Sequence, residues 1–126
     1  MKLKNDFFTI QKSEPTASGA SFLVRLNPES VIYKAHFPGR PITPGVCIVE
    51  MAVELLEEQL QHSFSVQMIK NLKFLAVISP EEVQEIIYDL KISNDDNGLI
   101  KTQVVVSASD KVYAKLTLIC NPTTNK

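Results

Sequence analysis

One histidine and one glutamate stand at the two ends of a segment that is rich in proline and glycine. The segment runs from His36 to Glu50, and its last third is an apolar run. A histidine can accept a proton near neutral pH and a carboxyl group can donate one, so the pair is suited to moving protons around a carbonyl compound. The prolines and glycines predict a stiff loop that leads into a helix.

The start of that helix offers a place for a negatively charged oxygen. Thr43 is predicted as the N-cap and Pro44 as the first helical residue, because the N–H that proline lacks would have no partner there. The free amides are then those of Gly45 and Val46, where the helix dipole adds about half a positive charge. Glu50 lies one turn beyond Val46, and helical side chains lean toward the N-terminus. We therefore expect its carboxyl group to point back at this end.

Each of these residues also has an ordinary structural interpretation. Glu50 begins a polar stripe that is typical of a solvated helix face, and its other members are Glu54, Glu57, Glu58 and Gln61. A single histidine in a loop is usually a surface or hydrogen-bonding residue. The combination of all the parts in this order favours a proton-transfer site over these interpretations.

The composition limits what kind of protein holds this segment. The chain has 126 residues, of which 44% are hydrophobic and 21% charged, as expected for one globular domain over residues 1–126. A net charge of −1 argues against nucleic-acid binding. No apolar stretch resembles a secretory signal or a membrane span, so we expect a cytoplasmic protein without a membrane partner. Cys47 and Cys120 lack metal-site spacing and are predicted to be reduced core residues.

Strand-like patterns flank the predicted helix on both sides. The helix is expected over residues 43–62, and alternating apolar and polar residues predict strands before and after it. These strands are 6–12, 20–27, 66–76, 83–93, 99–108 and 111–120, with a hairpin loop at 13–19 and at most a short extended piece at 31–33. The order predicts an α+β fold, with an antiparallel sheet of about five to six strands wrapped round one long central helix.

The proline-rich segment carries a resemblance to a known family. From His36 to Val46 it reads His-Phe-Pro-Gly-Arg-Pro-Ile-Thr-Pro-Gly-Val, with Glu50 following. This pattern closely resembles the signature of the bacterial 3-hydroxyacyl-(acyl-carrier-protein) dehydratases of fatty-acid synthesis. Residues 71–74 and 79–80 are similar to the strand that follows the helix in that family. The resemblance implies a hotdog fold and a homodimer, or a larger assembly of dimers, with the active site between two chains.

The resemblance also implies roles for individual residues. His36 is expected to remove the C2 proton of a 3-hydroxyacyl thioester, and Glu50 to help the C3 hydroxyl leave, directly or through water. The Gly45 and Val46 amides would bind the thioester oxygen. The resemblance implies no metal or redox cofactor. It also implies a substrate that arrives as a thioester on the phosphopantetheine of an acyl carrier protein.

Phe37 and Pro38, which follow the histidine, are the remaining expected substrate-binding residues. Arg40 and Lys73 are candidate contacts for the acidic carrier, since a basic residue attracts an acidic partner.

Some positions depart from the family pattern. Ala35 stands where the family usually has glycine, Glu54 stands where it often has glutamine, and the family's typical N-terminal segment is missing. A carboxyl group at Glu54 is expected to raise the pKa of one of the two neighbouring carboxyls. Two other functions remain open: a hotdog thioesterase, and a non-catalytic acyl-binding subunit that pairs with a related chain.

Overall fold

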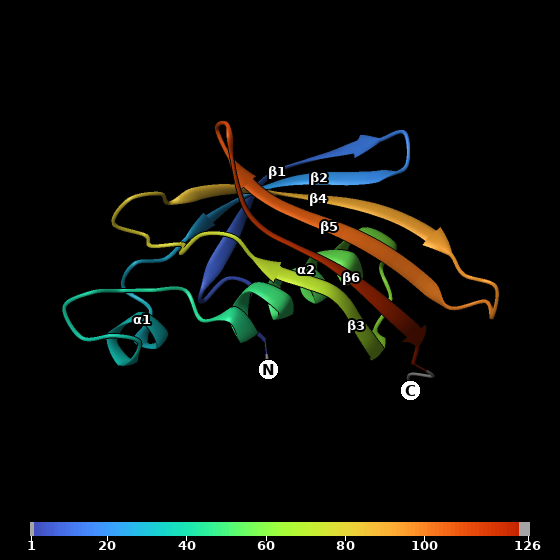
Figure 1. Cartoon of the computed structure of the whole chain (residues 1–126), viewed down its shortest axis with the longest axis horizontal. Helices are drawn as coiled ribbons and strands as arrows, with labels where there is room; N and C mark the ends of the chain where they lie inside the picture. Colours follow the sequence, from blue (N-terminus) through green and yellow to red (C-terminus); the bar gives the residue numbers. More distant parts are fainter. Residues whose placement is uncertain (1, 124–126) are drawn as a thin grey trace.

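Six antiparallel strands form one sheet that curves round a long helix, as expected from the sequence (Figure 1). The computed structural model describes residues 2–123. Along the sheet the strand order is β1-β2-β4-β5-β6-β3, so the strand after the helix lies at one edge. The strands are β1 (Phe8–Thr16), β2 (Gly19–Leu26), β3 (Phe64–Phe74), β4 (Glu85–Asn94), β5 (Ile100–Ala108) and β6 (Lys111–Pro122), and the helices are α1 (Val31–Ala35) and α2 (Gly45–Leu60).

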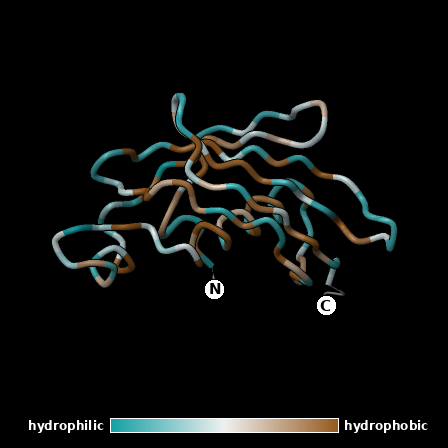
Figure 2. Tube along the Cα trace, in the orientation of Figure 1, coloured by the Kyte–Doolittle hydropathy of each residue, from teal (hydrophilic) through white to brown (hydrophobic). Residues whose placement is uncertain are grey.

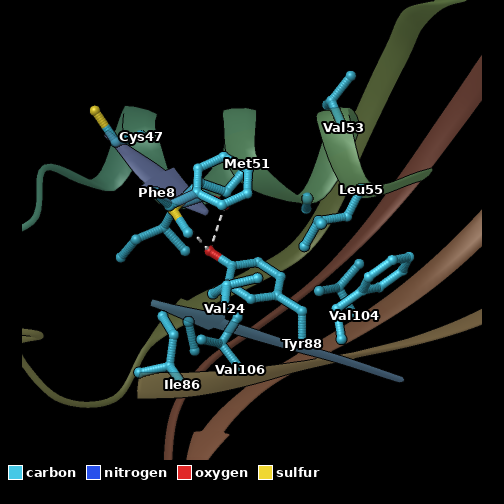
Figure 3. Packing of buried hydrophobic residues seen from close by; sticks show 14 of the residues in the cluster. Phe8, Val24, Cys47, Met51, Val53, Leu55, Ile86, Tyr88, Val104 and Val106 are labelled. Carbon is cyan, nitrogen blue, oxygen red and sulfur yellow. Dashed lines mark hydrogen bonds between the residues drawn. The ribbon is translucent and has the colours of Figure 1, made fainter. Parts of the chain in front are cut away.

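The hydrophobic core lies between α2 and the inner face of the sheet. Figure 3 shows Met51 and Leu55 pointing from α2 toward Tyr88 and Val104 on the sheet, and all four side chains are buried. The Tyr88 hydroxyl donates a hydrogen bond to the carbonyl oxygen of Ile48 at 3.0 Å. Because every second residue of a strand faces the same side, apolar residues at alternate positions of β2, β4, β5 and β6 produce this single core. The core fixes the orientation of α2 and thus of its N-terminus.

The helix α2 begins one residue later than predicted. Pro44 is the N-cap, with extended backbone angles and no side-chain cap, and Gly45 is the first helical residue. The Thr43 hydroxyl group is hydrogen-bonded to the Tyr33 hydroxyl at 2.7 Å and, among the described residues, makes no bond to the start of the helix. The helix ends at Leu60, before a left-handed Gln61, rather than near residue 62. The amides predicted to be free, those of Gly45 and Val46, still lie in its first turn.

Two predictions for the first third of the chain are wrong. The short extended piece at 31–33 belongs to α1, whose first turn is capped by the Ser30 side chain, which accepts a bond from the Ile32 N–H. The hairpin loop at 13–19 is shorter than expected, because β1 and β2 continue to Thr16 and from Gly19. Pro15 fits within β1 because this strand is a sheet edge, where a missing N–H breaks no ladder bond. The four strands after α2 agree with the prediction to within about two residues.

The two edges of the sheet differ in character. β1 carries polar side chains and Pro15, which discourage pairing with another strand. β3 exposes a row of large apolar side chains instead, namely Val66, Met68, Ile69, Leu72 and Phe74. Figure 2 shows the turns at 94–99 and 108–111 as hydrophilic, whereas hydrophobic residues continue along the strands. An apolar open edge of this length is expected to be covered by another chain.

Within the described residues, no helix is long and apolar enough to cross a membrane.

Candidate active site

The loop that carries His36 is anchored at its base by Tyr33. The Tyr33 ring stacks on Phe7, with ring centroids 4.8 Å apart, and its hydroxyl group bonds Thr43 just before α2. Both hydroxyl-bearing residues are buried, and burial raises the pKa of Tyr33 to about 12. The Thr43 N–H donates to the carbonyl oxygen of Ile78 at 2.8 Å. These contacts hold α1, the loop and the start of α2 together.

His36 follows α1 directly and is exposed to solvent. Its N–H donates to the Ile32 carbonyl oxygen at 3.0 Å, and its own carbonyl oxygen accepts from the Ile42 N–H at 2.9 Å. The backbone at the histidine is therefore fixed on both sides while the imidazole ring is free to meet a ligand. The ring lies edge-on to that of Phe37, with centroids 5.9 Å apart.

The residues after His36 form a tight turn. Phe37 and Arg40 exchange backbone hydrogen bonds of 3.2 and 2.9 Å, and Gly39 lies between them with a φ of 76°. This φ lies in the left-handed region that favours glycine, which explains the Pro38-Gly39 pair. Phe37 and Pro38, the expected substrate-binding residues, are both exposed on this turn.

The N-terminus of α2 presents two unused donors. Among the described residues, neither the Gly45 nor the Val46 N–H has a hydrogen-bond acceptor, whereas the Cys47 N–H bonds the Pro44 carbonyl oxygen at 3.0 Å. Val46 points its side chain outward. A cavity of about 370 Å³ lies beside these donors, and Gly45, Ile48 and Phe74 are among its mostly apolar lining. The place suits a polarised oxygen with an apolar chain attached.

The ring of Phe74 covers Gly45. A Cβ atom at position 45 would lie 2.8 Å from the Phe74 Cζ, so a glycine is what allows the aromatic ring to rest on the helix start. Phe74 is itself about half exposed, at 51%. This contact was not predicted, because the sequence does not show which residue of β3 meets the end of α2.

Glu50 lies near the middle of α2 and is partly exposed. Its pKa is raised to about 7, first by burial and then by a hydrogen bond and the negative charge of Glu54, with Glu57 adding to the effect. A carboxyl group with a pKa near 7 retains a proton at neutral pH much of the time. Glu50 therefore has the property that a general acid needs.

The structure leaves His36 and Glu50 separate within one chain. In residues 2–123, no hydrogen bond or ion pair joins the two side chains. The amides of Gly45 and Val46 lie between them along the chain, at the start of the helix that carries Glu50. The expectation from the sequence is that His36 of one chain meets Glu50 of a second chain.

The Arg40 and Lys73 side chains line different cavities. Arg40 is next to Glu81 and Glu82, whereas Lys73 lies on the outer face of the sheet, beside Lys115 of β6. That outer cavity, of about 620 Å³, contains none of the residues predicted for the active site. Within the described residues, no cluster of three or more histidine, cysteine or acidic residues is placed to hold a metal ion.

A family model described as "ApeI dehydratase" matches residues 11–115 of the chain. The chain belongs to the ApeI-like dehydratase family. The chain is also similar to proteins described as 3-hydroxyacyl-(acyl-carrier-protein) dehydratase FabZ. The protein from Fusobacterium nucleatum is 30% identical over 97 residues, which are 73% of this chain and 66% of that protein. That from Levilactobacillus brevis is 30% identical over 103 residues, which are 76% of this chain and 68% of that protein.

A solved structure supports the assignment of the fold. The dehydratase heterocomplex ApeI:P from Xenorhabdus doucetiae aligns with a TM-score of 0.65 and 21% identity, covering 88% of this chain and 95% of that chain. The fold of this ApeI-like family member is therefore the hotdog fold. The aligned part of the chain spans about two thirds of the length of the FabZ proteins.

Proposed function

We propose that the protein dehydrates a 3-hydroxyacyl thioester to the trans-2-enoyl thioester, in fatty-acid synthesis or a related acyl-chain pathway. The observation that carries this proposal is a carboxyl group with a pKa raised to about 7, on a helix whose first amides are free. Membership of a dehydratase family supports the same chemistry. Each step can be assigned to a described residue.

His36 takes the proton from C2 of the substrate, and the electron pair of that C–H bond forms the new double bond. The C3–O bond then breaks, and Glu50 gives its proton to the departing hydroxyl group, which leaves as water. The imidazolium and the carboxylate recover their starting forms by passing the proton back through solvent. General acid and base groups of this kind typically contribute about 10² to 10⁴ in rate each.

The thioester oxygen binds the N–H groups of Gly45 and Val46. Negative charge builds on this oxygen as the C2 proton leaves, and the positive end of the α2 dipole stabilises it. One oxyanion donor is typically worth about 3 kcal/mol of transition-state stabilisation. Phe37 and Pro38 would then border the acyl chain at the exposed turn.

The substrate is proposed to arrive on the phosphopantetheine arm of an acyl carrier protein in the cytoplasm, without a metal or redox cofactor. Elimination of water neither oxidises nor reduces the substrate, so this chemistry requires no electron carrier. The FabZ relatives are named for carrier-bound substrates, which supports the carrier over coenzyme A. Lys73 and Lys115, opposite each other on the outer face of the sheet, are the basic pair proposed to attract an acidic carrier.

The active site is proposed to form in a dimer through β3. This edge strand exposes apolar side chains, and pairing it with β3 of a second copy would bury them and satisfy its free backbone groups. His36 of one copy would then face Glu50 of the other. Light scattering on the purified protein would test the dimer, and a monomer that still turns over substrate would contradict it.

The central experiment is turnover of a 3-hydroxyacyl carrier-protein substrate by the purified protein, followed through the absorbance of the enoyl product. His36→Ala and Glu50→Gln should each reduce turnover by about 10² or more. Thermal unfolding of both variants serves as the control for folding. Undiminished turnover by both variants would refute the proposed roles.

A complementation experiment tests whether the site is shared. Each single variant lacks one of the two groups, so a mixed dimer of His36→Ala and Glu50→Gln chains contains one intact pair. Unfolding and refolding the two variants together should restore up to about a quarter of wild-type activity, because half of the dimers are mixed and each has one intact site. Activity no higher than that of the separate variants would place both groups of a site on one chain.

A second candidate is a subunit that is active only with a related chain. The solved structure of a heterocomplex containing an ApeI dehydratase favours this possibility. Activity that appears only when a second hotdog protein is added would support it, whereas turnover by the homodimer alone would exclude it. Thioester hydrolysis is less favoured, since the family and the relatives above are dehydratases. Release of free thiol without enoyl product would revive it.

A further inference from the structure

Glu54 occupies an unusual place for an acidic residue of a helix. It was expected to belong to a solvated stripe, but it is buried, with 6% of its surface exposed. A buried carboxylate is costly unless hydrogen bonds compensate for lost water. The structure supplies those bonds from the N-terminal segment, residues 2–7, which runs beside α2 (Figure 1).

Both oxygens of Glu54 are used to hold this segment. The Leu3 N–H donates to one oxygen and the Lys4 N–H to the other, each at 2.7 Å. The Lys4 ammonium group continues along the helix to Glu58, at 2.6 Å. Leu3 and Phe7 are themselves buried, so the segment is part of the folded core and not a loose tail. The Glu54 carboxylate is therefore fixed in position by two hydrogen bonds from the N-terminal segment.

Glu50 lies one turn before Glu54 on the same face of α2, and the nearby Glu54 carboxyl group adds to burial in raising the pKa of Glu50. Two neighbouring carboxyl groups favour a state in which one of them keeps a proton. Because Glu54 accepts bonds from two N–H groups, which favour its charged form, this proton is assigned to Glu50.

We propose that Glu54 is a positioning residue, whose carboxylate is held by the N-terminal segment one helical turn from Glu50 and favours the protonated form of Glu50. Only the description of Glu50 as the catalytic acid rests on the proposed function. The coupling between the two glutamates is a property of the folded chain. Glu54 thus gives the N-terminal segment an influence over proton transfer.

Other groups near Glu50 are accounted for. On α2, Glu57 and Cys47 interact with it electrostatically, and the Glu57 carboxylate accepts the Phe64 N–H of β3 at 2.9 Å. From the N-terminal segment, the Lys4 ammonium group is directed to Glu58. The chain's amino group is on residue 1, outside the described residues. In the proposed dimer, His36 of a second copy would also face Glu50.

The test compares Glu54→Gln with Glu58→Gln. Both remove one negative charge from α2 next to the N-terminal segment, but Glu54 lies one turn from Glu50 and Glu58 lies two turns away. Carbon-13 NMR of labelled glutamate side chains, with Glu50 assigned through Glu50→Gln, measures the titration midpoint of Glu50 without any turnover. We expect Glu54→Gln to lower this midpoint by about one pH unit or more and Glu58→Gln to leave it nearly unchanged. An unchanged midpoint in Glu54→Gln would overturn the proposal.

The wild-type protein provides a measurement that does not depend on a variant folding. The carboxyl group that titrates near pH 7 in its spectra should be that of Glu50. Assignment of this titration to Glu54 would overturn the proposal. In turnover assays, the basic limb of the pH profile of kcat should move to lower pH in Glu54→Gln alone. The expected NMR shift in a protein without turnover would support the coupling and contradict dehydration by this chain alone.

Discussion

The first and second halves of α2 differ in whether their polar groups are hydrogen-bonded. In the first turn the Gly45 and Val46 amides have no acceptor among the described residues. In the second half, Glu54, Glu57 and Glu58 each bond a group of the N-terminal segment or β3. The first N–H groups of any helix lack a partner within the helix, so these two are available to bind a substrate oxygen. The contrast separates a half of the helix available for chemistry from a half used to hold the fold together.

The largest effect is expected at the open half, from Gly45→Ala. The added methyl group would displace the Phe74 ring and crowd the two free amides, so turnover should fall by roughly tenfold or more. The Phe74 ring must shift to make room for the methyl group, so a small loss of stability should accompany the loss of turnover. Steady-state kinetics and thermal unfolding measure the two effects, with Val31→Ala, at an exposed position on α1, as the control. Full activity in Gly45→Ala would argue against an oxyanion site at these amides.

The second prediction compares how substitutions at Glu50 and at Glu54 change the stability of the protein. Because the pKa of Glu50 is raised from 4.5 to about 7, the folded state keeps a proton that the unfolded state loses between those values. Stability therefore falls as the pH rises through this window, and the loss is complete above it. Glu50→Gln should thus stabilise the protein at about pH 8 and have little effect at about pH 4.

Glu54→Gln should have the opposite sign, because glutamine cannot accept both N–H bonds from the N-terminal segment. Melting temperatures of both variants at the two pH values decide the point. If both substitutions shift the melting temperature in the same direction at about pH 8, the distinction between the two halves of α2 fails.

A smaller effect is expected where the His36 loop joins α2. Tyr33→Phe removes the bond to Thr43 and leaves a buried hydroxyl group without its partner, which should cost about 1 to 2 kcal/mol of unfolding free energy. Denaturant unfolding of Tyr33→Phe, Thr43→Val and the double variant forms a complete cycle. Simple additivity of the two single effects would show that this bond does not hold the loop.

The smallest effect is expected for Lys4→Ala. The Lys4 and Glu58 side chains are partly exposed, so their ion pair should contribute about 0.5 kcal/mol or less and weaken as salt is added. Urea unfolding at low and high salt measures this, with Lys12→Ala as a control in a more exposed pair. A loss that salt does not reduce would mean that Lys4 acts by packing and not by charge.

Much of the fold follows from local patterns. Alternation predicted all six strands, and the apolar run after Pro44 predicted α2, because a half-buried strand and a buried helix impose different spacings on apolar residues. The prediction from local patterns was wrong at residues 31–33, which were expected to be extended but belong to α1. An apolar residue such as Tyr33 fits the pattern of a strand as well as that of a helix. Its contacts with Phe7 and Thr43, which are distant in sequence, belong to the helical form found there.

In the candidate site too, some features could be predicted from the sequence and others depend on the tertiary structure. The sequence determined which residues carry the chemistry, since His36, Glu50 and the glycine at the start of α2 are visible as types and spacings. Only the tertiary structure decided what surrounds them: Phe74 over Gly45, the N-terminal segment bound to Glu54, and the apolar edge of β3 left open. Each of these involves segments more than 20 residues apart, and their meeting depends on how the sheet curves round α2. A pattern read along the chain contains the groups but not the neighbours that set their protonation and exposure.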